Sequence, residues 1–94
     1  MRVRDWVACQ DPELLLLEGE EFDAAIVGVV SCHGQEPRVV YDRELVIQVL
    51  MVNHDMDAED AVEWFDHNIA CAYVGEHTPA FLDRPDTGKK APGP

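Results

Sequence analysis

Residues 24–32 form an uninterrupted apolar run that is rich in β-branched side chains. A run of this length and composition favours a β-strand covered on both faces, although a buried helix shares the same lack of polar alternation. Residues 33–37 supply Gly and Pro for a turn, and residues 38–41 return to β-branched and aromatic side chains. The pattern therefore predicts two strands joined by a short loop.

Two helices are predicted after these strands. Asp42 is placed to cap the first, which extends to Asn53 because its apolar residues recur at offsets of three and four. Asp57 is placed to cap the second, and Gly75 is expected to end it. The inner face of the second helix is predicted to comprise Ala61, Trp64, Phe65, Asn68, Ile69 and Ala72.

The two ends of the chain carry weaker signals. Residues 1–12 show little periodicity, and residues 14–17 fit either one helical turn or a short strand. Residues 76–82 predict a loop that leads into a short extended segment. We therefore expect a small single α+β domain, in which a β-hairpin is packed by two α-helices and followed by a short extended C-terminal segment. The expected boundaries are an N-terminal arm over 1–20, a compact α+β domain over 21–82 and a flexible tail over 83–94.

The cysteines indicate a reducing compartment. Cys9, Cys32 and Cys71 are odd in number and widely spaced, without a CxxC pair, so neither a disulfide framework nor a zinc knuckle is indicated. Asp5 and Asp11 interrupt the stretch where a signal peptide would be apolar, and no segment approaches the roughly 18 apolar residues of a spanning helix. We expect a cytoplasmic protein that does not bind membranes.

Three segments resemble a family of small, largely uncharacterised bacteriophage and prophage proteins. They are FDAAIVGV at 22–29, VYDRE at 40–44 with the helix that follows, and MDAEDAVEWFDHNI at 56–69 with AYVGEHTP at 72–79. The chain departs from the family at residues 53–55, where a Gly-containing turn is more usual. The resemblance implies a phage or prophage origin, a small α/β fold and a cytoplasmic location during infection, and it implies no reaction.

The charge distribution limits the class of partner. The formal net charge is −12 on 94 residues, and no Lys or Arg lies between Glu44 and Asp83. Such a potential repels nucleic acid and anionic lipid headgroups and attracts basic proteins or cations. The acidic residues inside this interval are Asp55, Asp57, Glu59, Asp60, Glu63, Asp66 and Glu76.

The second predicted helix is the candidate binding surface. Helical spacing places Glu59, Glu63 and Asp66 on one stripe, with Asp60 beside it. Carboxylates so spaced can imitate phosphates toward a protein that binds nucleic acid, and they can equally serve only as a solvated, solubilising face. Trp64 is expected in the core, but an exposed Trp64 would form a protein-binding hot spot rimmed by acid. The predicted partner-binding residues are Asp55, Glu59, Asp60, Glu63, Trp64 and Asp66.

Catalytic and metal sites are weakly supported. His67 and Cys71 are four residues apart and Cys32 with His33 could approach them, but a buried inert thiol is the commoner role for such a cysteine. Adjacent Cys32 and His33 point to opposite faces of a strand, which prevents direct activation of the thiol by that ring. Ser31 lacks a GxSxG setting, and no Gly-rich phosphate loop is present. We expect no catalytic residue, metal or cofactor, and therefore no enzyme.

These observations lead to one functional hypothesis and one alternative. The first is a phage-derived acidic protein that binds and inhibits a host or defence protein, in its most concrete form as a nucleic-acid mimic that contacts a basic, nucleic-acid-handling protein without binding nucleic acid itself. The alternative is a structural or accessory phage protein that forms homo-oligomers through the apolar hairpin, while its charge maintains solubility.

Overall fold

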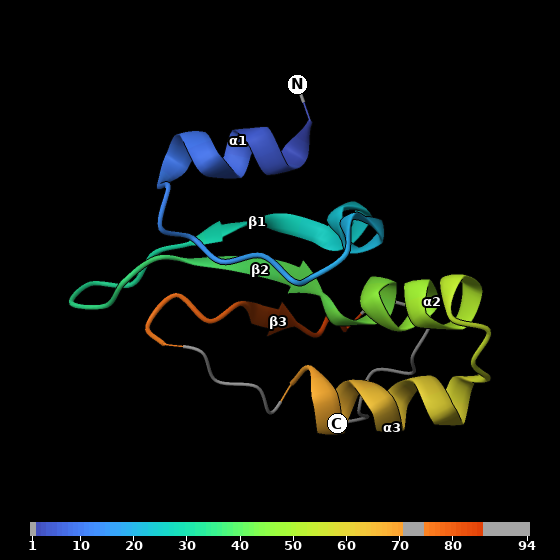
Figure 1. Ribbon diagram of the computed structural model, residues 1–94. Helices are drawn as coiled ribbons and strands as arrows, with labels where there is room; N and C mark the ends of the chain where they lie inside the picture. Colours follow the sequence, from blue (N-terminus) through green and yellow to red (C-terminus); the bar gives the residue numbers. More distant parts are fainter. Residues whose placement is uncertain (1, 71–74, 86–94) are drawn as a thin grey trace.

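The computed structural model describes residues 2–70 and 75–85 (Figure 1). The sheet and its flanking helices form the expected α+β domain. The elements in chain order are α1 (Val3–Gln10), the 3₁₀ helix η1 (Glu20–Ala25), β1 (Ile26–Val30), β2 (Arg38–Asp42), α2 (Arg43–Asn53), α3 (Ala58–Asn68) and β3 (Ala80–Leu82).

The sheet has three strands in the order β1-β2-β3. β1 and β2 form the expected antiparallel hairpin, with Val29 opposite Val39 and a register shift between Ile26 and Gly28. β3 pairs in parallel with β2, placing Phe81 beside Tyr41. A parallel neighbour requires a long crossover, and α2 and α3 supply it. The predicted extended C-terminal segment is therefore confirmed, and it is a third strand of the sheet.

Both predicted helix caps are confirmed. Oδ1 of Asp42 accepts the backbone N–H of Leu45 at 3.3 Å, and Oδ1 of Asp57 accepts that of Asp60 at 2.8 Å. Each bond satisfies one of the backbone donors that a helix leaves free at its N-terminus. The expected end of the second helix at Gly75 is wrong. α3 ends at Asn68 because the N–H groups of Ile69 and Ala70 both bond to the carbonyl of Phe65, which closes the last turn.

The N-terminal segment differs from the expectation. Residues 3–10 form α1, and residues 14–17 belong to neither a helix nor a strand. α1 depends on tertiary contacts: Nε of Arg4 lies 2.6 Å from Oδ2 of Asp23, and Val7 is buried in the core. The helix lies near β1, at the end of the sheet away from β3 (Figure 1).

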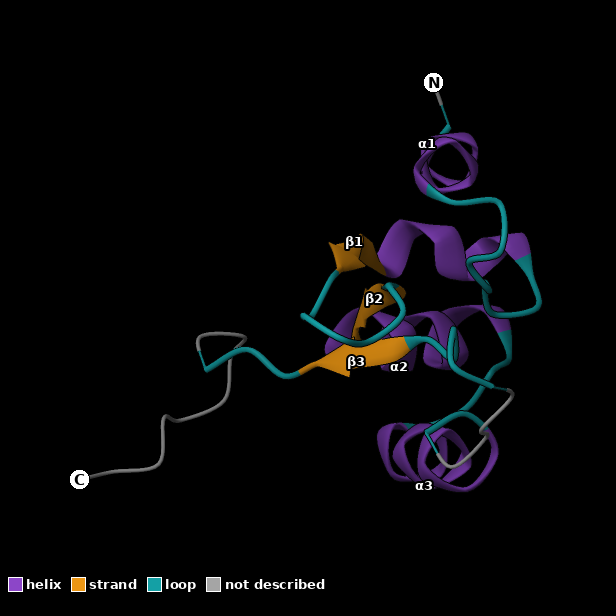
Figure 2. Cartoon of the chain, turned by 90° about the vertical axis from the view of Figure 1, so that its left-hand side faces the viewer, coloured by secondary structure: helices purple, strands orange, loops and turns teal. Residues whose placement is uncertain are grey.

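β1 is not covered on both faces. Val27 and Val30 are 46% and 45% exposed. α1 and α3 both lie on the same side of the sheet, and α2 continues from the end of β2 (Figure 2). The strand also begins later than expected, because Ala24 and Ala25 belong to η1.

The core lies between the sheet, the helices and the leucine-rich segment 14–17. Tyr41 is fully buried, and its hydroxyl accepts the backbone N–H of Leu17 at 2.9 Å. Burial raises the pKa of this phenol. The buried apolar residues are Val7, Leu14, Phe22, Ala25, Val39, Tyr41, Val46, Ile47, Leu50, Ala61, Phe65 and Ile69.

Candidate functional site

Trp64 lies at the rim of α3 rather than in the core. Ala61, Phe65 and Ile69 follow one another at intervals of four residues, and all three are buried. Trp64 is rotated by about 100° from Phe65 on the helix, and its side chain is 41% exposed. The prediction that Trp64 and Asn68 belong to the inner face is therefore wrong, because the buried line of α3 faces α2 and, through Phe65, the ring of Phe81 in β3. Ala72 lies outside the described residues.

Trp64 shares a shallow hollow with acidic residues. Asp60 and Glu63 line the same depression as the indole, together with Met56, His67 and Asn68. An aromatic ring beside two carboxylates offers an apolar face next to two hydrogen-bond acceptors of negative charge. This combination suits a cationic side chain that can lie over the ring and reach an oxygen atom.

The predicted stripe forms a second hollow on the same helix. Glu59, Glu63 and Asp66 line it with Ala58, Val62 and His67. Glu63 and His67 line both hollows, so the two acidic depressions adjoin each other along α3. The structure thus brings together five of the six predicted binding residues: Glu59, Asp60, Glu63, Trp64 and Asp66.

Arg43 neutralises part of the negative charge on α3. Its Nη2 lies 3.6 Å from Oδ1 of Asp66, its Nε lies 3.9 Å from a carboxylate oxygen of Asp83, and its guanidinium carbon lies 5.2 Å from the centre of the Phe65 ring. Asp66 is therefore partly neutralised within the fold. Glu59, Asp60 and Glu63 carry the greater part of the negative potential that α3 presents to a partner.

Asp55 is not part of the surface that the other five predicted residues form. It lies in the connection between α2 and α3, lines neither hollow, and has a φ of +54°. Only Gly adopts this left-handed region without cost, and Asp and Asn tolerate it better than other residues. The positive φ therefore gives Asp55 a conformational function in the connection between α2 and α3.

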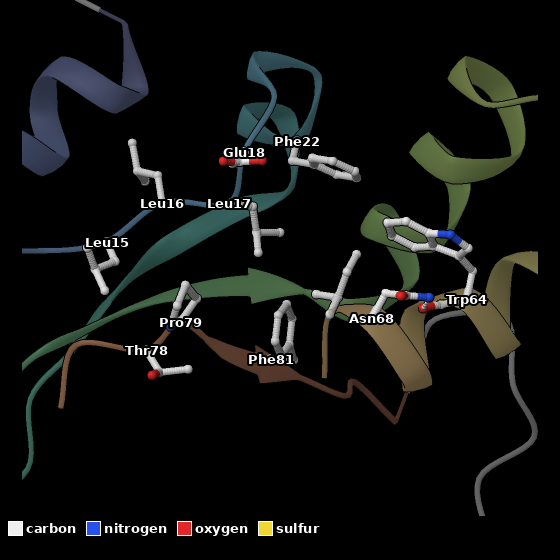
Figure 3. Close-up of a pocket in the computed structure, with 11 residues that line it drawn as sticks. Leu15, Leu16, Leu17, Glu18, Phe22, Trp64, Asn68, Thr78, Pro79 and Phe81 are labelled. Atoms are coloured by element: carbon white, nitrogen blue, oxygen red, sulfur yellow. Dashed lines mark hydrogen bonds between the residues drawn. The ribbon is translucent and has the colours of Figure 1, made fainter. Parts of the chain in front are cut away.

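A larger, apolar pocket adjoins Trp64. It has a volume of about 600 Å³, and Trp64 and Asn68 line both this pocket and the acidic hollow. Figure 3 shows these two residues at one end of the pocket. Its lining combines segments that are far apart in sequence, so no local motif could have predicted it. The lining residues are Leu15, Leu16, Leu17, Glu18, Phe22, Trp64, Asn68, Ile69, Thr78, Pro79 and Phe81.

His77 holds one wall of this pocket in place. One ring nitrogen, Nδ1, lies 2.9 Å from the carbonyl oxygen of Pro37, and Nε2 lies 3.6 Å from Glu13 and 3.9 Å from Glu36. The hydrogen bond to Pro37 and the nearby carboxylates raise the pKa of His77. The imidazole thereby ties the segment that carries Thr78 and Pro79 to the turn between β1 and β2.

Within residues 2–70 and 75–85, no three His, Cys, Asp or Glu side chains are arranged to hold a metal ion. Cys9 and Cys32 are free and exposed, while Cys71 lies outside the described residues. The same ranges contain no helix with the length and apolar character required to cross a bilayer.

The chain matches no family model, no curated protein and no solved structure with which it was compared. Its function is therefore inferred from the geometry of the surface around Trp64.

Proposed function

We propose that this protein acts by binding a basic partner protein through the acidic face of α3. The observation that carries the proposal is the exposure of Trp64 in a hollow that it shares with Asp60 and Glu63. Trp64 is exposed to nearly the same extent as Trp6, but it lines a hollow together with two carboxylates. Tryptophans are enriched among the interface residues that dominate binding energy. The neighbouring carboxylates of Asp60 and Glu63 favour a partner that is positively charged at this position.

The partner class follows from the same charges. Glu59, Asp60 and Glu63 lie on a helix that carries no Lys or Arg, within a chain of net charge −12. A protein that binds nucleic acid presents Lys and Arg side chains spaced for phosphates, and an array of carboxylates attracts the same groove. The proposed action is inhibition of such a host or defence protein by occupation of its nucleic-acid site, in the bacterial cytoplasm during phage infection. The resemblance to phage proteins and the free thiols of Cys9 and Cys32 support this setting.

A charge-reversal experiment tests the proposal. The Glu59→Lys, Glu63→Lys double variant reverses two charges on the α3 surface, and Asp5→Lys, Glu76→Lys reverses two exposed charges elsewhere. Both variants change the net charge equally, and Glu59 and Asp5 both lie in first helical turns, which matches their effects on helix dipoles. Each protein is used for affinity capture from a bacterial lysate, followed by mass spectrometry.

The wild type and the control variant are expected to retain the same basic, nucleic-acid-handling protein, and the α3 variant is expected to lose it. Heparin should compete for this partner, because it occupies the same Lys and Arg groove. Retention of the partner by the α3 variant would overturn the proposal.

A second candidate function has one observation in its favour. Val27 and Val30 are exposed on β1, where a second copy of the chain could cover them. Salt separates the two candidates, because screening weakens attraction between exposed charges whereas apolar association holds or strengthens. Sedimentation at low and high salt would reveal a homo-oligomer, and Val27→Ser with Val30→Ser should dissociate it.

A further inference from the structure

We infer that the apolar pocket beside Trp64 receives a bulky aliphatic or aromatic side chain from a basic segment of the partner, while a neighbouring Lys or Arg of that segment lies over Trp64 and meets Asp60 and Glu63. This inference rests on the proposed function and specifies its ligand. The occupant is thus an apolar residue flanked by cations, and not a bare run of basic residues.

The pocket has the size and lining of a ligand site. Its volume of about 600 Å³ falls within the range of about 300–1,000 Å³ that is usual for such sites. Figure 3 shows Leu15, Leu16 and Leu17 along one side, Pro79 and Phe81 along the other, and Trp64 with Asn68 at one end. An apolar side chain that enters this space removes leucine and aromatic surface from water on both sides, which stabilises the complex.

The charges around the pocket select a cationic neighbour. Glu18 is the charged residue among the described residues that line the pocket, and Asp60 and Glu63 lie just beyond the wall formed by Trp64. An occupant flanked by acidic residues would therefore meet like charge at Glu18 and again beyond Trp64. A Lys or Arg beside the anchor residue would instead gain attraction to the carboxylates and to the face of the indole ring.

Trp64 explains why the two parts of the ligand must be adjacent. The indole lines the apolar pocket and the acidic hollow at once, and Asn68, one turn along α3, does the same. Two side chains that occupy the two depressions are separated only by this wall. Neighbouring residues of one peptide segment meet this requirement, whereas a cation and an apolar residue from distant parts of a partner would need a special arrangement of its fold.

Three labelled peptides of about twelve residues serve as probes for this site. The anchor peptide has a central Leu in a background of Lys and Ser, the matched peptide has Ser in place of the Leu, and the acidic peptide keeps the Leu but replaces each Lys by Glu. Affinities are measured by fluorescence anisotropy, and the indole N–H resonance of Trp64 is followed by NMR after assignment with Trp6→Phe.

The anchor peptide is expected to bind about tenfold or more tightly than the matched peptide, since burial of one Leu side chain supplies this much affinity. The Trp64 resonance should shift with the anchor peptide and not with the acidic peptide. Leu15→Ser removes a pocket wall at a side chain that is 37% exposed, and Leu45→Ser is its control on α2 at 38%. Leu15→Ser should abolish the preference for the anchor peptide, and Leu45→Ser should preserve it. Asn68→Phe places a bulky ring where the apolar pocket meets the acidic hollow. This variant should also lose the preference for the anchor peptide.

Failure of this inference and failure of the proposed function give different results. The anchor and matched peptides could bind equally, with sensitivity to salt and no effect of Leu15→Ser. This result would contradict an apolar anchor in the pocket and leave the proposed charged surface intact. Equal binding of the anchor and acidic peptides would overturn the basic occupant and identify a general apolar site. If neither Lys-containing peptide shows salt-sensitive binding, both this inference and the proposed function are contradicted.

Discussion

Nε of Arg84 lies 2.9 Å from Oδ2 of Asp42, the buried carboxylate whose other oxygen caps α2. One side chain thus joins three parts of the fold: the end of β2, the first turn of α2 and the residue that follows β3 by two positions. Because a buried carboxylate is costly without partners, the contact couples the docking of β3 to the start of the helix.

Asp42→Ala is expected to lower the free energy of unfolding by about 2 kcal/mol, through loss of the cap and of the ion pair. Arg84→Ala should cost about 1 kcal/mol, which is less than for a fully buried pair because the guanidinium is partly exposed to solvent. Urea denaturation measures both values. An Asp42→Ala variant as stable as the wild type would contradict this account of the carboxylate.

Asp55 provides a test of backbone conformation against binding. Asp55→Gly should leave the stability unchanged or slightly higher, because Gly adopts a positive φ without strain, whereas Asp55→Ala should cost about 1 kcal/mol. Neither change should alter the affinity for the basic anchor peptide, since Asp55 lines neither hollow. Thermal melting and peptide titration measure the two effects. A loss of affinity in Asp55→Gly would show that Asp55 contributes to the binding surface.

Trp64 and Trp6 form a natural pair for separating binding from stability. Their exposed fractions are 41% and 38%, so replacement of either by Ala should reduce stability by a similar amount, about 1–2 kcal/mol. Only Trp64→Ala should weaken binding of the anchor peptide, by about 30-fold, as expected for a residue that contributes about 2 kcal/mol. Titration of both variants checks this, and an equal loss of affinity in Trp6→Ala would show that the effect is not local to α3.

His77 should make stability depend on pH in a defined direction. Its pKa is raised in the folded protein, so the protonated form is favoured by folding. The stabilisation is fully present below the unfolded value of about 6.5 and is lost as pH rises through the higher folded pKa. The wild type should therefore exceed His77→Gln in stability by more at about pH 5.5 than at about pH 8.5.

Glu36→Gln is the companion variant for this prediction. Its carboxylate lies 3.9 Å from Nε2 of His77 and contributes to the raised pKa, so its removal should reduce the pH dependence without abolishing it. Denaturant unfolding at the two pH values measures the difference. A gap between the wild type and His77→Gln that is constant with pH would show that the imidazole acts only through its packing.

The sequence by itself determined the features that depend on neighbouring residues. Asp42 and Asp57 cap helices at the expected positions because a cap is a contact between a side chain and a backbone group three residues away. The hairpin of β1 and β2 follows from two β-branched segments and a turn. The short extended segment before residue 83 follows from its composition. The acidic character of the α3 surface is likewise a property of local spacing.

Only the tertiary structure decided which faces of these elements are covered. α1 forms where Arg4 meets Asp23 and Val7 meets the core, and these contacts join residues that no short pattern relates. Trp64 is exposed because Ala61, Phe65 and Ile69 already fill the interface of α3, and the pocket beside it exists because β3 returns in parallel to β2. Helical periodicity gives the width of an apolar face but not its rotation against the sheet, and that rotation places the tryptophan at the surface.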